Sequence, residues 1–341
     1  MAAMATVHRQ RWHSIALTAV TLALFGLAVH VLRSELEGHS LRQLLLGVTE
    51  LPARALITAI AATIAGYASL ALYDVPAVRL LGKPLSRFRT MLGSFVNFAF
   101  VNNTGHTLVV GAIVRFRMHS RSGLGAGDIA ELVGFGVLTY WAGMLPLAAF
   151  GLLVDSDDVS RVAEIPLLSV RLLGAACAIG LFGLITFFRY GPSTIRLGRW
   201  NLKLPPVRVA LLQIAISATD IACAAFALHA LLPSEARAHV SAPAFVGLFA
   251  VVQFIGLASQ VPGGLGVVEA IFVKVFAPEV DAPAIVASLL AFRIIYGWAP
   301  FAVGAATLAV ESLRPVPRRT ASGPQSSLPD PLGEPGADHD R

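Results

Sequence analysis

Charged side chains are scarce in this sequence. Asp, Glu, Lys and Arg make up 13% of the 341 residues, whereas a soluble globular domain carries roughly 25%. Hydrophobic residues make up 56%, and the mean hydropathy is +0.72. In lipid only helices and closed barrels satisfy every backbone polar group, and the apolar runs here are too long for barrel strands. We therefore predict an all-α fold, a polytopic integral membrane helical bundle.

Cysteine is nearly absent, and the motifs of familiar enzyme sites are missing. Cys177 and Cys223 both fall in apolar runs, which favours packing roles over a disulfide or a metal site. The sequence has no Ser-His-Asp order, Walker-type glycine loop or zinc-ligand spacing, and His106 has no companion ligand nearby. We therefore predict no catalytic residues, no metal and no cofactor.

Basic residues outnumber acidic ones, with a net charge of +6 and a pI near 9.8. They cluster in short loops between apolar runs, the pattern that places Lys and Arg on the cytoplasmic side of a membrane. The excess therefore does not indicate a nucleic-acid partner. The basic segments are the N-terminus and residues 79–89, 115–121, 189–208 and 314–319, and the acidic or base-poor segments are residues 33–50, 155–164, 233–240 and 278–281.

Eight apolar segments follow one another along the chain. The first ends at Arg33 without a small-residue cleavage site, so we expect a retained span and not a removed signal peptide. We expect six full spans, at residues 12–32, 54–73, 129–154, 166–188, 209–232 and 284–311.

The other two segments, residues 91–111 and 242–277, have loops of the same charge character on both sides. A segment that enters and returns keeps both of its flanks on one side of the membrane. We expect two opposed re-entrant hairpins, the first entering from the cytoplasm and the second from outside, with both termini cytoplasmic. Each half of the chain then consists of two spans, a hairpin and a further span, which suggests an inverted repeat. No internal repeat is visible at residue level.

This organisation predicts three regions. Residues 1–11 form a cytoplasmic N-terminus, and residues 12–311 form the transmembrane domain. Residues 312–341 form a cytoplasmic tail, which we expect to be disordered because it is rich in Pro, Gly, Ser and Asp.

The stretch Ser259-Gln260-Val261-Pro262-Gly263-Gly264-Leu265-Gly266-Val267-Val268-Glu269 lies within an apolar region but cannot form an ordinary helix. Pro262 lacks an amide hydrogen, and the three glycines allow the backbone to bend or approach another group closely. Broken backbone at membrane depth is tolerated where it is buried in protein or lines a cavity. We therefore expect a substrate site here.

Charges inside apolar segments are expensive, at least ~2.5 kcal/mol each near the bilayer centre, so each requires a reason. Arg293 lies within residues 284–311, and its expected partners are Glu269 and a bound phosphate, which can coexist; an arginine holds a phosphate bidentately. Asp220 lies in mid-span near Gln213, where structural pairing, for example with Arg293, is favoured over substrate contact.

Polar side chains gather in the first hairpin. Asn97, Asn102, Asn103 and His106 could satisfy the freed backbone of a turn, but their density favours a polar lining for a lipid headgroup. Arg115 and Arg117 follow on the cytoplasmic side, where basic residues either hold anionic lipid phosphates or only set the orientation. Asp74 closes a span and is interpreted as a helix-end carboxylate that faces water.

Three motifs occur in order along the chain. The first is Asn102-Asn103-Thr104-Gly105, followed by Gly111-Ala112-Ile113-Val114-Arg115-Phe116-Arg117 and by Ser120 with Gly123-Leu124. The second is Val261-Pro262-Gly263-Gly264-Leu265-Gly266-Val267-Val268-Glu269. The third is Arg293-Ile294-Ile295-Tyr296 with Pro300. Together they resemble the bacterial lysylphosphatidylglycerol synthase/flippase family, the multiple peptide resistance factors, and its stand-alone transmembrane relatives. The resemblance covers roughly residues 12–311 and implies a role in antimicrobial peptide resistance.

The sequence departs from that family's pattern at several positions. His106, Thr107 and Leu108 replace the aromatic residue and glycines usual after Asn-Asn-x-Gly, Gln260 stands where His is common, and Val268 where Phe is common. Members that make lysylphosphatidylglycerol carry a soluble aminoacyl-tRNA-dependent transferase domain after this region, whereas this sequence continues into the tail. The resemblance therefore implies the flippase-like half, and whether the chain is an enzyme stays open, with a non-enzyme favoured.

The resulting hypothesis is an inner-membrane translocator for anionic or aminoacylated phospholipid, such as lysylphosphatidylglycerol. The alternatives are a membrane-embedded lipid-headgroup transferase and a non-transport partner of a lipid-modifying enzyme. The expected partners are a membrane phospholipid and either a second copy of the chain or a separate lipid-modifying enzyme. The expected substrate-binding residues are Asp74, Asn97, Asn102, Asn103, His106, Arg115, Arg117, Ser259, Gln260, Pro262, Gly263, Gly264, Gly266, Glu269, Arg293 and Tyr296.

Overall fold

A computed structural model of the chain describes residues 47–82, 85–104, 107–119, 124–192, 194–197, 200–276 and 280–313. The expected first span at residues 12–32, His106, residues 1–11 and all but the first two residues of the expected tail lie outside this described part. The corresponding expectations stay predictions.

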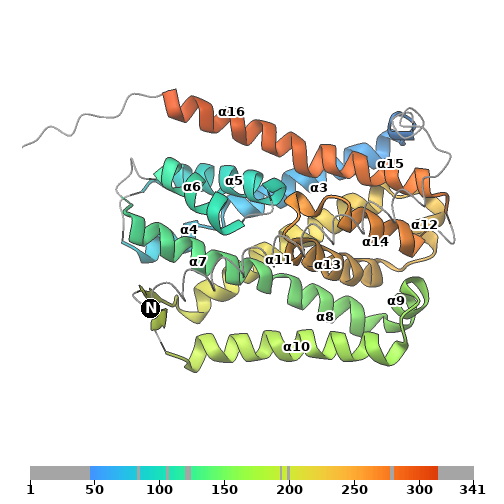
Figure 1. The fold of residues 1–341 in the computed structure, drawn as a ribbon, viewed down its shortest axis with the longest axis horizontal. Coiled ribbons are helices and arrows are strands. Elements are labelled where there is room, and N and C mark those ends of the chain that lie inside the picture. The colour runs from blue at the N-terminus through green and yellow to red at the C-terminus, as the bar shows by residue number, and fades with distance from the viewer. Residues whose placement is uncertain are drawn as a thin grey trace, which may run out of the picture.

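Long apolar helices dominate the described residues, and they run side by side along one direction (Figure 1). Within the described residues, five stretches are long and apolar enough to cross a membrane: Ala53–Leu80, Ala126–Val154, Leu167–Tyr190, Val207–Leu231 and Ala282–Glu311. They coincide with five of the six expected spans. They consist of α3 (Ala53–Ala71) with α4 (Val75–Leu80), α7 (Ala126–Ala142) with α8 (Met144–Val154), α10 (Leu167–Tyr190), α11 (Val207–Leu231), and α15 (Ala282–Phe292) with the π-helix η3 (Arg293–Trp298) and α16 (Ala299–Leu313).

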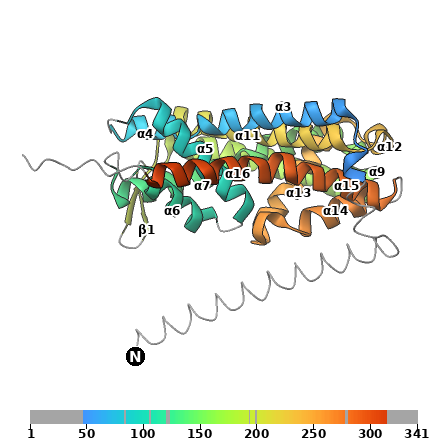
Figure 2. The same ribbon diagram turned by 90° about the horizontal axis from the view of Figure 1, so that it is seen from above.

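Each of the two expected hairpins corresponds to a pair of helices that follow one another in the chain. The first pair is α5 (Arg87–Thr104) and α6 (Thr107–His119), and the second is α13 (Ala242–Ala258), the 3₁₀ turn η2 (Pro262–Gly264) and α14 (Val267–Phe276). In Figure 2 the α6 end of the first pair and the α14 end of the second face one another near the middle of the molecule. That each pair enters and leaves on one side of the membrane stays a prediction, as does the inverted repeat.

Short elements lie at the two ends of the bundle. Helices α9 (Ser156–Ala163) and α12 (Ser234–Ala238) lie at one end, and the strands β1 (Thr194–Leu197) and β2 (Trp200–Lys203) lie at the other (Figure 2). The strands pair antiparallel with Thr194 opposite Lys203. This short hairpin is the exception among the described elements, which are otherwise helices, in agreement with the expected helical bundle. It forms in a loop between two spans, where alternating polar and apolar residues favour a strand and no long apolar run imposes a helix.

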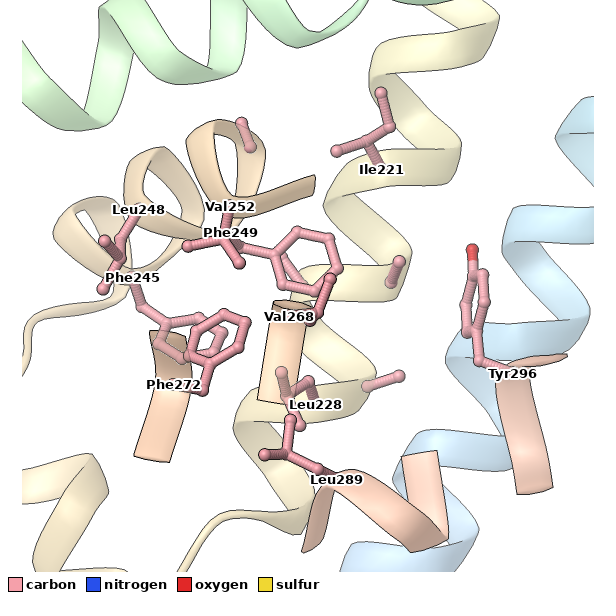
Figure 3. Packing of buried hydrophobic residues seen from close by; sticks show 14 of the residues in the cluster. Ile221, Leu228, Phe245, Leu248, Phe249, Val252, Val268, Phe272, Leu289 and Tyr296 are labelled. Atoms are coloured by element: carbon pink, nitrogen blue, oxygen red, sulfur yellow. The ribbon is translucent and has the colours of Figure 1, made fainter. Parts of the chain in front are cut away.

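The helix α11 is at the centre of the packing and contacts α3, α7, α13 and α15. A cluster of phenylalanines, including Phe245, Phe249 and Phe272, packs the second helix pair against α11 and α15 (Figure 3). By contrast, α10 is largely exposed along its length and presents large apolar side chains such as Ile179 and Phe182 outward. Because soluble proteins rarely expose contiguous apolar surface of this extent, this face fits contact with lipid.

Candidate functional site

The two helix pairs and the π-helix meet at one point, although their motifs are far apart in sequence. A Cβ atom built on Gly263 of η2 would lie 3.5 Å from the backbone oxygen of Asn103, at the end of α5. The side-chain amide of Asn103 also donates to the carbonyl oxygen of Gly297 in η3 at 3.2 Å. The end of α5, the break between α13 and α14, and the π-helix therefore meet at one site.

The break between α13 and α14 has the irregular backbone expected from its sequence. Gln260, Gly263, Gly264 and Gly266 all have positive φ angles, of 58°, 59°, 64° and 79°. Glycine adopts this region without a Cβ penalty, so three of these four positions are explained by residue type. The exception, Gln260, is held by a hydrogen bond from its side-chain amide to the carbonyl oxygen of Leu257, at 3.0 Å.

Ser259 and Pro262 shape the same break from its first residues. The hydroxyl of Ser259 donates to the carbonyl oxygen of Gly256 at 2.6 Å and accepts from the amide of Val261 at 3.2 Å. Pro262 begins the 3₁₀ turn, where its missing amide hydrogen leaves no hydrogen bond unmade. These two residues therefore support the loop and do not line the cavity.

Arg293 connects the last span to the second pair. Its Nε forms an ion pair with Oε1 of Glu269, and its Nη1 donates to the carbonyl oxygen of Gly263 at 2.8 Å. Glu269 in turn accepts from the amide of Gly266 at 2.8 Å through Oε2, which satisfies an otherwise unpaired amide just before α14. The expected pairing of Arg293 with Glu269 is confirmed.

The backbone of the last span changes from α to π geometry at Arg293 and returns to α after Trp298. Single π turns inside α-helices are frequent at functional sites. Here the π turn includes both Arg293 and Tyr296, which line the same cavity. The turn is thus the structural basis of the third sequence motif.

Asp220 lies in the middle of α11 and is 2% exposed. The hydroxyl of Tyr296 donates to its Oδ1 at 2.6 Å, and that of Tyr140 donates to its Oδ2 at 3.4 Å. Among the described residues no basic group forms an ion pair with it, so the interpretation that Asp220 pairs with Arg293 is wrong. The reason is that Glu269, one turn beyond the glycine break, reaches the guanidinium instead.

These groups enclose a cavity of about 60 Å³. That volume holds a few water molecules, each of which needs roughly 10–15 Å³ on this measure. Figure 3 shows Phe249, Val268 and Leu289, three of its apolar lining residues, facing α11, with Tyr296 on the side of α3. The lining is Asn102, Asn103, Tyr140, Asp220, Ile221, Ala224, Phe249, Gln253, Gly263, Val268, Glu269, Leu289, Phe292, Arg293, Tyr296 and Gly297.

An apolar groove of about 680 Å³ lies next to this cavity, between α3, α5 and the last span. Tyr296 lines the cavity and Tyr67 lines the groove, and their ring centroids are 5.6 Å apart. The pair therefore forms the partition between a polar and an apolar compartment. The groove is lined by Ile60, Thr63, Ile64, Tyr67, Ala68, Ala71, Phe88, Met91, Leu92, Phe95, Ile294, Ile295, Ala299, Pro300 and Val303.

A second buried polar cluster surrounds Asp74 and Arg115. Nε and Nη2 of Arg115 donate to the two carboxylate oxygens of Asp74, each at 3.0 Å, and both side chains are at most 4% exposed. With its amide oxygen turned toward Arg115, Asn97 accepts from Nη2 at 3.3 Å and donates to the carbonyl oxygen of Gly111 at 3.2 Å. The interpretation that Asp74 faces water is therefore wrong, because α6 returns along α5 and brings Arg115 to it.

The structure thus divides the expected site residues into groups. The cavity brings together Asn102, Asn103, Gly263, Glu269, Arg293 and Tyr296. Ser259, Gln260, Pro262, Gly264 and Gly266 shape the adjacent loop, whereas Asp74, Asn97 and Arg115 form the separate cluster. Arg117 is exposed on α6.

Sequence reasoning did not assign Tyr140, Gln253 or Asp220 to the site. The charge of Asp220 within an apolar span was a usable signal, since intramembrane ionisable residues are functional candidates by default. Tyr140 and Gln253 carry no such signal, because single residues of these types are common in helices of a membrane bundle. Only the approach of α7 and α13 to α11 places them around the cavity.

Comparisons with known proteins agree with a membrane bundle. The chain is 31% identical to the uncharacterized protein slr0712 of Synechocystis sp. over 323 residues, which cover 93% of this chain and 98% of that protein. It is 29% identical over 254 residues to the inner membrane protein YbhN of Escherichia coli, with coverage of 72% and 76%. No family model matches the chain. The chain therefore belongs to the protein family that includes slr0712, and the five span-length apolar helices in its described part together with its similarity to YbhN identify it as a membrane protein.

Proposed function

We propose that this protein is an inner-membrane translocator for anionic or aminoacylated phospholipid, of which lysylphosphatidylglycerol is one. The observation that carries the proposal is the convergence of Asn102–Asn103, Gly263–Glu269 and Arg293–Tyr296 on one cavity beside an apolar groove. These are the three motifs on which the resemblance to the flippase family rests. The inner-membrane location is supported by the similarity to YbhN.

The charges of the cavity suit a phospholipid headgroup. An arginine guanidinium binds a phosphate through two parallel hydrogen bonds, and Arg293 is positioned for this once Glu269 releases it. Glu269 would then be free to meet the ammonium group of an aminoacylated headgroup. The amides of Asn102 and Asn103 supply donors and acceptors for the ester and hydroxyl oxygens.

The neighbouring groove suits the other half of the same ligand. A phospholipid needs an apolar path for its acyl chains while its headgroup is held in a polar site. The groove begins at Tyr67, directly beyond the ring of Tyr296 that lines the cavity. A lipid could therefore place its phosphate near Arg293 and an acyl chain along α3 and α5.

The cavity is too small for a lipid headgroup in this conformation, since about 60 Å³ holds only a few water molecules. We infer that the two helix pairs enter the membrane from opposite sides and that translocation requires them to separate in alternation. Separation of the first pair would break the hydrogen bond from Asn103 to Gly297, and separation of the second would break the ion pair of Glu269 with Arg293.

Reconstituted liposomes provide the test. The protein is incorporated with acyl-labelled fluorescent phosphatidylglycerol, lysylphosphatidylglycerol or phosphatidylcholine, and dithionite measures the fraction that reaches the outer leaflet. We expect faster exchange of the anionic or the aminoacylated lipid than in protein-free liposomes, loss of this gain in Arg293→Ala, and no loss in Arg208→Gln, which removes a positive charge at an exposed position on α11. Equal rates with and without protein for every lipid would refute the proposal.

A further inference from the structure

Asp220 is a carboxyl group inside the cavity that the binding of a headgroup does not use. Its oxygens contact two tyrosine hydroxyls, those of Tyr296 and Tyr140, and no basic group of the described residues pairs with it. An ionised carboxylate in a membrane interior costs at least ~2.5 kcal/mol when it lacks a cation. Burial without a cation therefore favours the protonated, neutral form of Asp220, whereas the two tyrosine donors favour the ionised form.

The groups that face Asp220 come from each neighbouring element. Tyr67 on α3, Tyr140 on α7 and Tyr296 on η3 surround it, Arg293 and Glu269 lie across the cavity, and α13 contributes the neutral side chain of Gln253. On its own helix the nearest titratable group is Cys223. The charges of Arg293 and Glu269 cancel in their ion pair, so a charge on Asp220 would be uncompensated.

The hydroxyls around Asp220 offer a route for a proton. The single proton of Tyr296 has two acceptors, Oδ1 of Asp220 at 2.6 Å and its backbone oxygen at 2.9 Å. The hydroxyl of Tyr67 is buried without a hydrogen-bond partner among the described residues, beside the ring of Tyr296. Gly66 leaves room for the contact between Tyr296 and Asp220, because a Cβ at that position would lie 2.1 Å from the hydroxyl of Tyr296 and 3.0 Å from Oδ1 of Asp220.

Charge balance links this proton to the lipid. A phosphate that replaces Glu269 on Arg293 brings one more negative charge into a cavity of low polarity, and an ionised Asp220 would repel it. An ionised Asp220 would also compete for Arg293. Protonation of Asp220 removes both effects, so proton and anionic headgroup favour each other's binding by the same factor.

We propose that Asp220 is a proton-binding site that couples proton movement to lipid movement, so that a proton and an anionic headgroup occupy the cavity together and cross in the same direction. This inference rests on the proposed translocation.

The first test does not depend on transport. Infrared difference spectra of the purified protein in lipid, recorded between acidic and alkaline pH, detect the C=O stretch of protonated carboxyl groups. We expect a band that titrates, is absent from Asp220→Asn and is retained in Asp157→Asn, a matched control because Asp157 is exposed on α9. A spectrum that Asp220→Asn leaves unchanged overturns the proton site, whatever the lipid assay shows.

The second test uses the liposomes described above with an imposed pH gradient. We expect exchange of phosphatidylglycerol in the direction of proton flow to rise several-fold, and Asp220→Asn, which mimics the neutral acid, to keep exchange but lose its dependence on the gradient. If lipid exchange by the wild-type protein does not depend on the pH gradient, or depends on a sodium gradient instead, the coupling is overturned while translocation stands. Absence of exchange under every condition refutes translocation itself, and the coupling with it.

Discussion

The guanidinium of Arg293 donates a hydrogen bond to the carbonyl oxygen of Gly263 at 2.8 Å. Gly263 lies in the break between α13 and α14, and Arg293 begins the π turn of the last span. One side chain therefore connects two segments that depart from α-helical geometry and whose contacting residues are 30 positions apart in sequence. Because Glu269 binds the same guanidinium, any displacement of the second helix pair from the last span must break a charged contact.

Removal of either partner of the Arg293–Glu269 pair should destabilise the protein. Arg293→Met leaves the carboxylate of Glu269 poorly solvated and unpaired, and a loss of about 3 kcal/mol is typical of such a change. The double variant Arg293→Met with Glu269→Gln should recover much of this loss. Thermal unfolding in detergent, followed by tryptophan fluorescence, measures the stability of the two single variants and the double variant. A double variant whose loss equals the sum of the two single losses would show that the two residues are not coupled.

The buried pair of Asp74 and Arg115 should matter more for folding than the exposed Arg117. Asp74→Ala leaves an unpaired guanidinium at a position that is at most 4% exposed, and we expect a loss of about 3–5 kcal/mol. Arg117→Ala should stay within about 0.5 kcal/mol, as surface substitutions do. The yield of monodisperse protein after extraction reports the difference, and similar losses for both variants would contradict the assignment of Asp74 and Arg115 as a structural pair.

Gly263 should not tolerate a side chain, whereas a glycine in open space should. Gly263→Ala places a Cβ at φ 59° and 3.3 Å from Arg293, and the left-handed conformation alone costs about 1–2 kcal/mol. Gly180→Ala on α10, where a Cβ meets nothing within 4 Å, should be neutral or stabilising by up to about 1 kcal/mol. The melting temperature should fall for Gly263→Ala and should stay the same or rise for Gly180→Ala. Equal shifts for the two variants would argue against a strained backbone at Gly263.

Two tyrosines in ring contact should respond differently to loss of their hydroxyls. Tyr296→Phe removes the hydrogen bonds to Asp220 and should cost about 1–3 kcal/mol, because a buried acceptor loses its donor. Tyr67→Phe removes a hydroxyl without a partner among the described residues and should be neutral or stabilising. Chemical unfolding in mixed micelles compares the two, and a larger loss for Tyr67→Phe would mean that its hydroxyl is hydrogen-bonded in the membrane.

Much of the helical organisation could be predicted from the sequence. The spans at residues 129–154, 166–188 and 209–232 agree with α7–α8, α10 and α11 to within a few residues, because a long apolar run in lipid has only one way to satisfy its backbone. The break at Ser259–Glu269 was equally predictable, since Pro262 and three glycines oppose a continuous helix. The β-hairpin after α10 was not, because outside the membrane no comparable constraint acts on the loop.

Pairing of charged side chains was predicted less well. The Arg293–Glu269 pair was one of two stated possibilities, but Asp74 was assigned to water and Asp220 to a structural ion pair. Which acid meets which base depends on the relative position of α3, α6 and α11, and helix packing is decided by side chains spread along whole helices. A linear charge pattern contains no such information.

By itself, the sequence determined that this is a helical membrane protein with its backbone broken at Ser259–Glu269, because the cost of unpaired backbone groups in lipid leaves few alternatives for such a composition. Only the tertiary structure decided that the second helix pair and the last span meet around one cavity and that Arg115 pairs with Asp74. It also decided that Asp220 faces three tyrosines and has no ion-pair partner among the described residues. These contacts join residues 24 to 80 positions apart, and such separations are bridged by packing and not by local sequence preference.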